Sequence, residues 1–113
     1  MITIYHNPRC GKSREGLAFI QSLHVEYELV KYLETPLSNK KLKEIIKKLN
    51  LKPIELVRVK ESVWISQFKG KNLSDEQIIQ AMVEHPILIE RPIVINGDKA
   101  IIARPFEKIR EIL

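Results

Sequence analysis

Hydrophobic residues along the chain follow the period of a strand in some segments and of a helix in others. Residues Ile2–Tyr5 are β-branched and aromatic, which predicts a short buried strand. From Cys10 onward apolar residues recur at helical spacing, with Leu17 and Ile20 on one face. A weaker alternation over residues 27–32 predicts a second strand. Because no hairpin turn joins these strands, we expect them to run parallel in a right-handed βαβ unit.

The middle of the chain, residues 38–84, carries mainly helical patterns. Three helix starts fall in this block, at Ser38, Pro53 and Ser74. Each is a residue type favoured there, because a serine hydroxyl accepts a hydrogen bond from the first turn and proline leaves no N–H unpaired. The first helix is predicted to reach about Asn50, and the third to stop before Pro86. Residues 59–72 favour no particular element.

The C-terminal part of the chain predicts a hairpin followed by a helix. Residues 93–95 and 100–103 are apolar and flank the turn 96–99, which is typical of an antiparallel hairpin. The final helix is expected to start at Pro105. Its inner face is predicted to carry Phe106, Ile109 and Leu113.

The order of elements is βαβ, a helical block, then ββα. We therefore predict an α/β, thioredoxin-like fold, with a mixed four-stranded sheet flanked by helices. Residues 1–113 are expected to form a single domain, with a core at 1–37 and 86–113 and a helical insertion at 38–84.

Composition excludes several classes of protein. With 113 residues, of which 44% are hydrophobic and 29% charged, the chain has the composition of an ordinary globular domain and not of a disordered or fibrous one. The opening residues have neither a basic segment nor a long apolar run, so we expect a cytoplasmic protein with no membrane contact. His24 and His85 have no cysteine or carboxylate at ligand spacing, so no metal site is predicted.

The net charge of +5 raises the question of an acidic partner. The whole excess lies in residues 39–52, which carry six lysines against one glutamate on a predicted amphipathic helix. Such a run is usually the solvated outer face of a helix. The chain also lacks a nucleic-acid-binding motif and has few aromatic residues for stacking, so nucleic-acid binding is not expected.

Cys10 is the only cysteine and stands where the first strand meets the first helix. The positive end of the helix dipole favours a thiolate there, and we expect Arg9, Lys12 and Arg14 to act in the same sense. His6 is expected to hydrogen-bond the sulfur or to add charge. The alternative is that the thiol is simply a small buried apolar group.

The segment Cys10-Gly11-Lys12-Ser13 is a C-x-x-S motif, in which a hydroxyl replaces the second thiol of a redox pair. Ser13 can donate a hydrogen bond to a thiolate but cannot resolve a disulfide. A covalent adduct on Cys10 therefore needs an external thiol for its release.

Three arginines lie beside apolar segments, at Arg58, Arg91 and Arg104. Arginine suits multidentate recognition of oxyanions. Each also has a glutamate nearby in the sequence as an alternative partner, namely Glu55, Glu90 or Glu107. For each arginine taken singly, the ion pair is the simpler interpretation.

Four motifs stand in order along the chain. They are His6-Asn7-Pro8-Arg9-Cys10-Gly11-Lys12-Ser13-Arg14, Tyr32-Leu33-Glu34-Thr35-Pro36, His85-Pro86-Ile87-Leu88-Ile89-Glu90-Arg91-Pro92-Ile93-Val94 and Arg104-Pro105. Together they resemble the glutaredoxin-dependent arsenate reductase family over essentially the whole chain. The resemblance implies a thioredoxin-like enzyme that reduces arsenate to arsenite, with glutathione as co-substrate, glutaredoxin as partner and no bound cofactor.

The resemblance also implies roles for individual residues. Cys10 matches the nucleophile, His6 a residue that lowers the pKa of the thiol, and Ser13 one that supports the thiolate. The three arginines that match oxyanion-binding residues are Arg58, Arg91 and Arg104. The positions that match the loop around the site are Asn7, Pro8, Arg14 and Pro92, the last as a cis-proline facing that loop.

Two positions depart from the arsenate reductases proper. Arg9 and Lys12 resemble a sister subgroup, which leaves open a glutathione-linked reductase of another substrate. A further alternative is a thiol-stress transcription regulator of the same fold that docks on RNA polymerase, although Ser13 breaks the C-x-x-C switch that those regulators carry.

Overall fold

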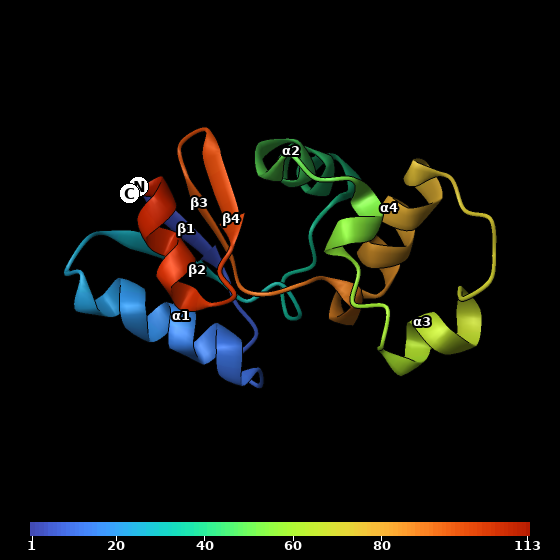
Figure 1. Ribbon diagram of the computed structural model, residues 1–113, viewed down its shortest axis with the longest axis horizontal. Helices are drawn as coiled ribbons and strands as arrows, with labels where there is room; N and C mark the ends of the chain where they lie inside the picture. Colours follow the sequence, from blue (N-terminus) through green and yellow to red (C-terminus); the bar gives the residue numbers. More distant parts are fainter. The chain divides into compact units, whose positions relative to one another are not determined.

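A four-stranded sheet is built from the two ends of the chain (Figure 1). In the computed structural model, which describes residues 1–113, the strand order is β2-β1-β3-β4. The strands are β1 (Ile2–Tyr5), β2 (Tyr27–Val30), β3 (Ile93–Asn96) and β4 (Lys99–Ile102). β1 is parallel to β2 and antiparallel to β3, which is antiparallel to β4. The predicted α/β, thioredoxin-like fold with a mixed four-stranded sheet is confirmed.

The chain divides into two compact units. The first comprises residues 1–35 and 91–113 and contains the sheet, and the second comprises residues 36–90. The predicted helical insertion at 38–84 lies within the second unit. No helix combines the length and the apolar character needed to cross a membrane.

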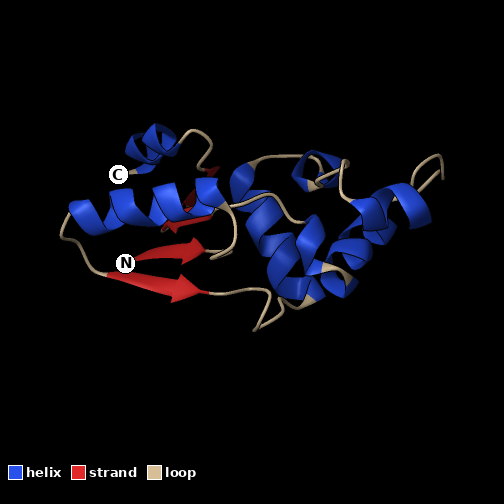
Figure 2. Ribbon diagram, turned by 90° about the horizontal axis from the view of Figure 1, so that it is seen from below, coloured by secondary structure: helices blue, strands red, loops and turns tan.

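The core of the first unit lies between the sheet and two helical elements (Figure 2). These are α1 (Gly11–Ser22) and the 3-10 helix η3 (Phe106–Ile112). Ile4 of β1 is fully buried beside its register partner Val94, and Ile20 of α1 joins the same apolar cluster. Phe19 of α1 and Phe106 of η3 have ring centroids 5.3 Å apart. The two helical elements therefore cover one face of the sheet, and the buried strand predicted at Ile2–Tyr5 lies beneath them.

The last element differs from its prediction. It is a 3-10 helix, and it buries Ile109 and Ile112 while Leu113 is 54% exposed. Placing Leu113 on the inner face was therefore wrong. A 3-10 helix has three residues per turn, so its inner positions recur every third residue instead of following the α-helical spacing.

The second unit is helical, as its sequence pattern predicts. Its elements are α2 (Asn39–Leu49), η1 (Pro53–Leu56), α3 (Ser62–Gln67), α4 (Asp75–Glu84) and η2 (Pro86–Leu88). α2 and α4 begin at their predicted serines, because the Ser38 and Ser74 hydroxyls each accept a hydrogen bond from the first turn. α3 occupies part of the unassigned segment 59–72, where Trp64 is buried and stacks on Phe68. The six lysine side chains of residues 40–52 are exposed.

Candidate active site

The loop that follows β1 brings the chain to the start of α1. His6 N–H donates to the Val30 carbonyl at 2.8 Å, which extends the pairing of β1 and β2 by one residue. The chain then turns, and Cys10 N–H donates to the Asn7 carbonyl at 3.0 Å. The Asn7 side-chain oxygen accepts from Arg9 N–H at 3.0 Å, which holds the tip of the turn. These bonds fix Cys10 directly beyond the end of the first strand.

Cys10 is the N-cap residue of α1 and is partly exposed. Its backbone is extended, its side chain makes no capping hydrogen bond, and the first turn of α1 holds no acidic residue. The first N–H groups of any helix lack intrahelical acceptors and carry the positive end of its dipole. This positive end is therefore not neutralised by a capping side chain.

The surroundings of the sulfur lower the pKa of the Cys10 thiol. Burial by itself raises this pKa, but the N–H of Ser13, the guanidinium of Arg91 and the N–H of Lys12 favour the charged form and outweigh it. Arg91 acts both as a hydrogen-bond donor and through its charge. The lowered pKa thus has two sources. One is the N–H groups at the start of α1, and the other is the guanidinium of Arg91, the residue before Pro92.

Buried polar side chains hold the loop beneath the sulfur. His6, Asn7 and Ser13 are each at most 3% exposed. His6 Nδ1 and Ser13 Oγ lie 2.7 Å apart, and Ser13 Oγ accepts from Asn7 N–H at 3.0 Å. The hydroxyl of Ser13 is therefore engaged by the loop, and Ser13 acts on the sulfur through its backbone N–H.

This arrangement changes the role expected of His6. Burial lowers the pKa of its imidazole, and the nearby charge of Lys31 lowers it further. His6 is consequently uncharged at neutral pH and contacts Ser13. The lowered pKa disfavours an added charge from His6, and its contact with Ser13 supports the loop that presents the N–H groups.

Two of the basic side chains that neighbour Cys10 in sequence, those of Lys12 and Arg14, have partners other than the sulfur. Arg14 Nη1 donates to the Pro8 carbonyl at 3.0 Å, and Lys12 Nζ lies 3.6 Å from Glu15 Oε2. The charge that lowers the pKa of the thiol comes from Arg91, which is distant in sequence. The expectation that the neighbouring side chains supply this charge is corrected accordingly.

Arg91 and Arg104 lie together in the first unit. Arg91 is only 6% exposed, and its carbonyl accepts a hydrogen bond from Arg104 Nη1 at 3.4 Å. The Arg91–Pro92 and Arg104–Pro105 peptide bonds are both cis, the first as the resemblance implies. Arg91 also acts on the thiol of Cys10, whose pKa it lowers as a hydrogen-bond donor and through its charge.

Arg58 belongs to the second unit and is held by two carboxylates. Its Nε lies 3.2 Å from Glu61 Oε1, and its Nη1 lies 3.7 Å from Glu90 Oε1. Its backbone N–H donates to the Leu88 carbonyl at 2.7 Å. For Arg58 the ion-pair interpretation therefore describes the structure.

A glycine inside α1 allows the helix to approach the residue after Arg91. A Cβ atom at Gly16 would lie 2.8 Å from Pro92 Cγ, which is closer than real contacts allow. Glycine within a helix normally costs stability, so its presence at this position signals such a close approach. This contact was not predicted from the sequence. The effect of the Lys31 charge on the pKa of His6 was not predicted either, and no pattern in the sequence indicates it.

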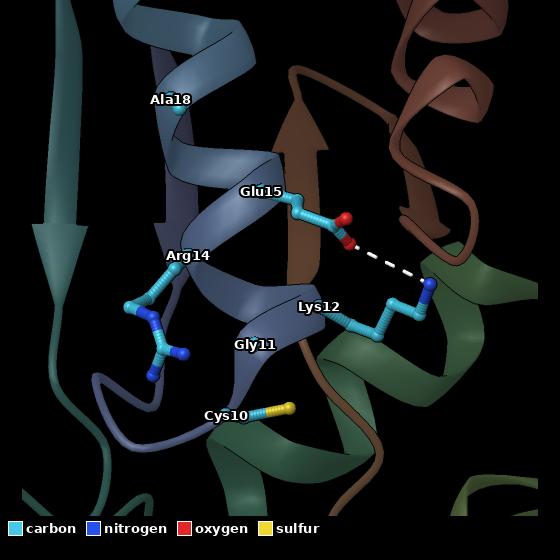
Figure 3. A pocket seen from close by; sticks show the side chains of 6 residues that line it. All are labelled: Cys10, Gly11, Lys12, Arg14, Glu15 and Ala18. Carbon is cyan, nitrogen blue, oxygen red and sulfur yellow. Dashed lines mark ion pairs between the residues drawn. The ribbon is translucent and has the colours of Figure 1, made fainter.

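An open pocket of about 610 Å³ lies over the start of α1 (Figure 3). Its lining residues are Cys10, Gly11, Lys12, Arg14, Glu15 and Ala18. No group of three or more His, Cys, Asp or Glu side chains that could hold a metal ion occurs in the structure. The arrangement brings together a thiol of lowered pKa, the backbone N–H groups at the start of a helix and a buried guanidinium, which suits nucleophilic attack on a small anion.

Several known proteins are similar to this chain. The ArsC family model matches residues 5–112. "Uncharacterized protein YfgD" of Escherichia coli (strain K12) is 46% identical over 99% of this chain and 96% of its own length. The arsenate reductase of Haemophilus influenzae is 42% identical over 99% of this chain and 98% of its own. The solved structure of the arsenate reductase from Vibrio cholerae superposes on this chain with a TM-score of 0.94. The two chains are 42% identical, and the match covers 99% of this chain and 97% of the Vibrio cholerae chain. The chain belongs to the ArsC family.

Proposed function

We propose that this protein reduces arsenate to arsenite, with Cys10 as the nucleophile and with glutathione and a glutaredoxin as the sources of electrons. The observation that carries the proposal is the Cys10 thiol at the uncapped start of α1, its pKa lowered by Arg91. The similarity to proteins named arsenate reductase supports arsenate as the substrate. Without a second thiol in the chain, the electrons must come from outside.

The first step is attack of the Cys10 thiolate on arsenic. A sulfur–arsenic bond forms, an arsenic–oxygen bond breaks, and the oxygen leaves as water after taking up protons. Negative charge accumulates on the remaining oxygens in this step. The N–H groups at the start of α1 and the guanidinium groups of Arg91 and Arg104 are suited to offset it.

The second step releases arsenite. The thiolate of glutathione attacks the sulfur of Cys10, so that a disulfide forms while the sulfur–arsenic bond breaks. The electron pair of that bond stays on arsenic, which passes from the +5 to the +3 state. A glutaredoxin thiol then attacks the glutathione sulfur and restores Cys10. Two external thiols have supplied the two electrons.

The loop residues act as support in this scheme. His6 and Ser13 keep the N–H groups of α1 in place without touching the reacting atoms. A role for Arg58 in binding the oxyanion rests on the resemblance alone and stays a proposal. We place the reaction in the cytoplasm, because a free thiol and its thiol partners stay reduced there.

A coupled assay tests the proposed function. The full chain is incubated with arsenate, glutathione, a glutaredoxin, glutathione reductase and NADPH, and arsenite is measured along with NADPH oxidation. We expect arsenite to form only when all components are present, and no arsenite from Cys10→Ser. Reduction of a glutathionylated peptide or of another oxyanion without arsenite formation would replace arsenate by that substrate.

A further inference from the structure

One ion pair on the wall of the pocket has no part in the scheme above. Lys12 and Glu15 both line the pocket over Cys10, and their charged groups lie 3.6 Å apart. Figure 3 shows the side chains of Cys10 and Lys12 extending to the same side of the first turn, with Glu15 reaching toward Lys12. The pair therefore lies beside the sulfur, on the wall of the pocket through which a second molecule can approach it.

Arg14 and Arg91, two other cations at this end of the unit, are placed differently from Lys12. Arg14 points to the other side of the turn in Figure 3 and donates to the Pro8 carbonyl. Arg91 is buried and acts on the sulfur. Lys12 contributes to the lowered pKa of the thiol through its backbone N–H. Its ammonium group is thus available for something other than the sulfur.

The pair is also easily exchanged. The two side chains are 55% and 50% exposed and stand three residues apart on one helix. Exposed pairs of this kind contribute about 0 to 1 kcal/mol, because water competes for both charges. An incoming carboxylate can therefore take the place of Glu15 at little cost.

We propose that Lys12 binds the carboxylate of the thiol that approaches Cys10, and that Glu15 competes for Lys12 until this thiol arrives. The pair thereby selects carboxylate-bearing thiols over neutral ones. The inference rests on the proposed function, since it concerns the thiol that attacks the Cys10 adduct. Lys12 and Glu15 determine specificity in this account and take no part in the bond changes.

Thiol–disulfide exchange on Cys10 tests the proposal without arsenate. In this reaction the Cys10 thiolate attacks a disulfide reagent, a new disulfide forms on Cys10, and one reagent thiolate leaves. Thiol–disulfide exchange is reversible, so this reaction has the same transition state as the attack of an external thiol on a disulfide of Cys10. The two probes are dithiobis(nitrobenzoate), which carries carboxylates, and dithiodipyridine, which is neutral at the assay pH.

The quantity to compare is the ratio of the rate constants for the anionic and the neutral probe at one pH. A change in the pKa of the thiol alters both rates in proportion, so the ratio reports only on charge at the approach. We expect Lys12→Gln to lower this ratio about threefold to tenfold, and Glu15→Gln to raise it about threefold, because both charges act near the water-exposed approach. The effect should shrink as salt is added.

Lys99→Gln is the matched control, because it removes the same charge from the first unit. Lys99 pairs with Asn96, which pairs with Ile2, and so lies at the end of β1 opposite to Cys10. Its ratio should equal that of the unaltered protein. The double variant Lys12→Gln/Glu15→Gln tests whether Glu15 competes for Lys12. If it does, Glu15→Gln should raise the ratio of rate constants less when Lys12 is absent.

Three outcomes would overturn the proposal. An unchanged ratio in Lys12→Gln would show that Lys12 does not act on the incoming molecule. An equal fall in Lys99→Gln would show that only net charge matters. Equal gains from Glu15→Gln with and without Lys12 would refute the competition. A Cys10 that reacts with neither probe would instead contradict the proposed function, so the two failures can be told apart.

Discussion

The helices α1 and α4 begin in opposite ways. α4 starts at Ser74, whose hydroxyl accepts from Gln77 N–H at 3.2 Å while the Gln77 side chain accepts from Ser74 N–H at 2.8 Å. Asp75 and Glu76 in its first turn add negative charge at the positive end of the dipole. α1 starts at Cys10, without a capping bond and without an acidic residue in its first turn. One helix start is stabilised by its own side chains, and the other keeps its donors for a reacting group.

The capped start of α4 contributes to the stability of the fold, whereas the uncapped start of α1 contributes to the reactivity of Cys10. A capping box contributes to stability only because it satisfies N–H groups that would otherwise be unpaired. In α1 these groups, together with Arg91, favour the negative charge of the sulfur instead. The helix that gives up a stabilising cap gains a reactive thiol. The predictions below change one helix start or the other.

The largest expected effect is the loss of turnover in Cys10→Ser, by a factor of about a thousand or more, because the nucleophile is removed. Serine is also a preferred N-cap, so we expect the free energy of unfolding to rise by about 0.5 to 1 kcal/mol. Arsenite production and urea denaturation measure the two effects. Cys10→Ala, which cannot cap, should lose activity without gaining stability. Activity retained in either variant would refute the role of Cys10.

The next effect concerns the glycine inside α1, which has no counterpart in α4. Gly16→Ala places a Cβ against Pro92 and should lower the free energy of unfolding by about 1 to 3 kcal/mol through overpacking. The matched control is Gly11→Ala, whose Cβ meets only the end of the Arg14 side chain, at 3.7 Å. Urea denaturation of both variants measures their free energies of unfolding. Equal stability would mean that α1 does not lie against Pro92.

Arg91→Gln removes the charge that acts on the sulfur. The pKa of the Cys10 thiol should rise, so that the thiolate fraction at neutral pH falls. The alkylation rate with neutral iodoacetamide, followed against pH, should reach its plateau at higher pH than in the unaltered protein. Arg104→Gln is the control, because Arg104 contacts the Arg91 carbonyl and not the sulfur. A pH profile that does not move in Arg91→Gln would contradict the assignment.

The smallest effect is at the capped helix. Ser74→Ala should lower the free energy of unfolding by about 1 kcal/mol, since the hydroxyl that caps α4 is lost, and Ser74→Asp should restore it. The alkylation rate of Cys10 should remain that of the unaltered protein in both variants. A slower alkylation in Ser74→Ala would show that the two helix starts are not independent.

The strands, the capped helices and the place of Cys10 could be predicted from the sequence, because each depends on local pattern. Ser38 and Ser74 mark helix starts by their chemistry, and the four predicted apolar or alternating segments form the sheet. The six-residue helix α3 could not be assigned, because it is too short to show periodicity. Leu113 was misplaced because the pattern of its segment does not distinguish a 3-10 helix from an α-helix.

The site was predicted less completely than the fold. The sequence places His6, Cys10 and Ser13 around the junction of a strand and a helix, but which atoms face the sulfur depends on the hydrogen bonds of the folded junction. Arg58 and Arg91 look alike in sequence, yet one is held by two glutamates and the other acts on the thiol. Contacts between residues distant in the chain decide such roles, and local patterns do not contain them.

The start of α1 and Arg91 together favour the thiolate form of Cys10. A titration of the thiol, followed by the ultraviolet absorbance of the thiolate with Cys10→Ser as the blank, measures this directly. We predict a pKa below the ordinary value of about 8.5. A pKa at or above that value would contradict the account.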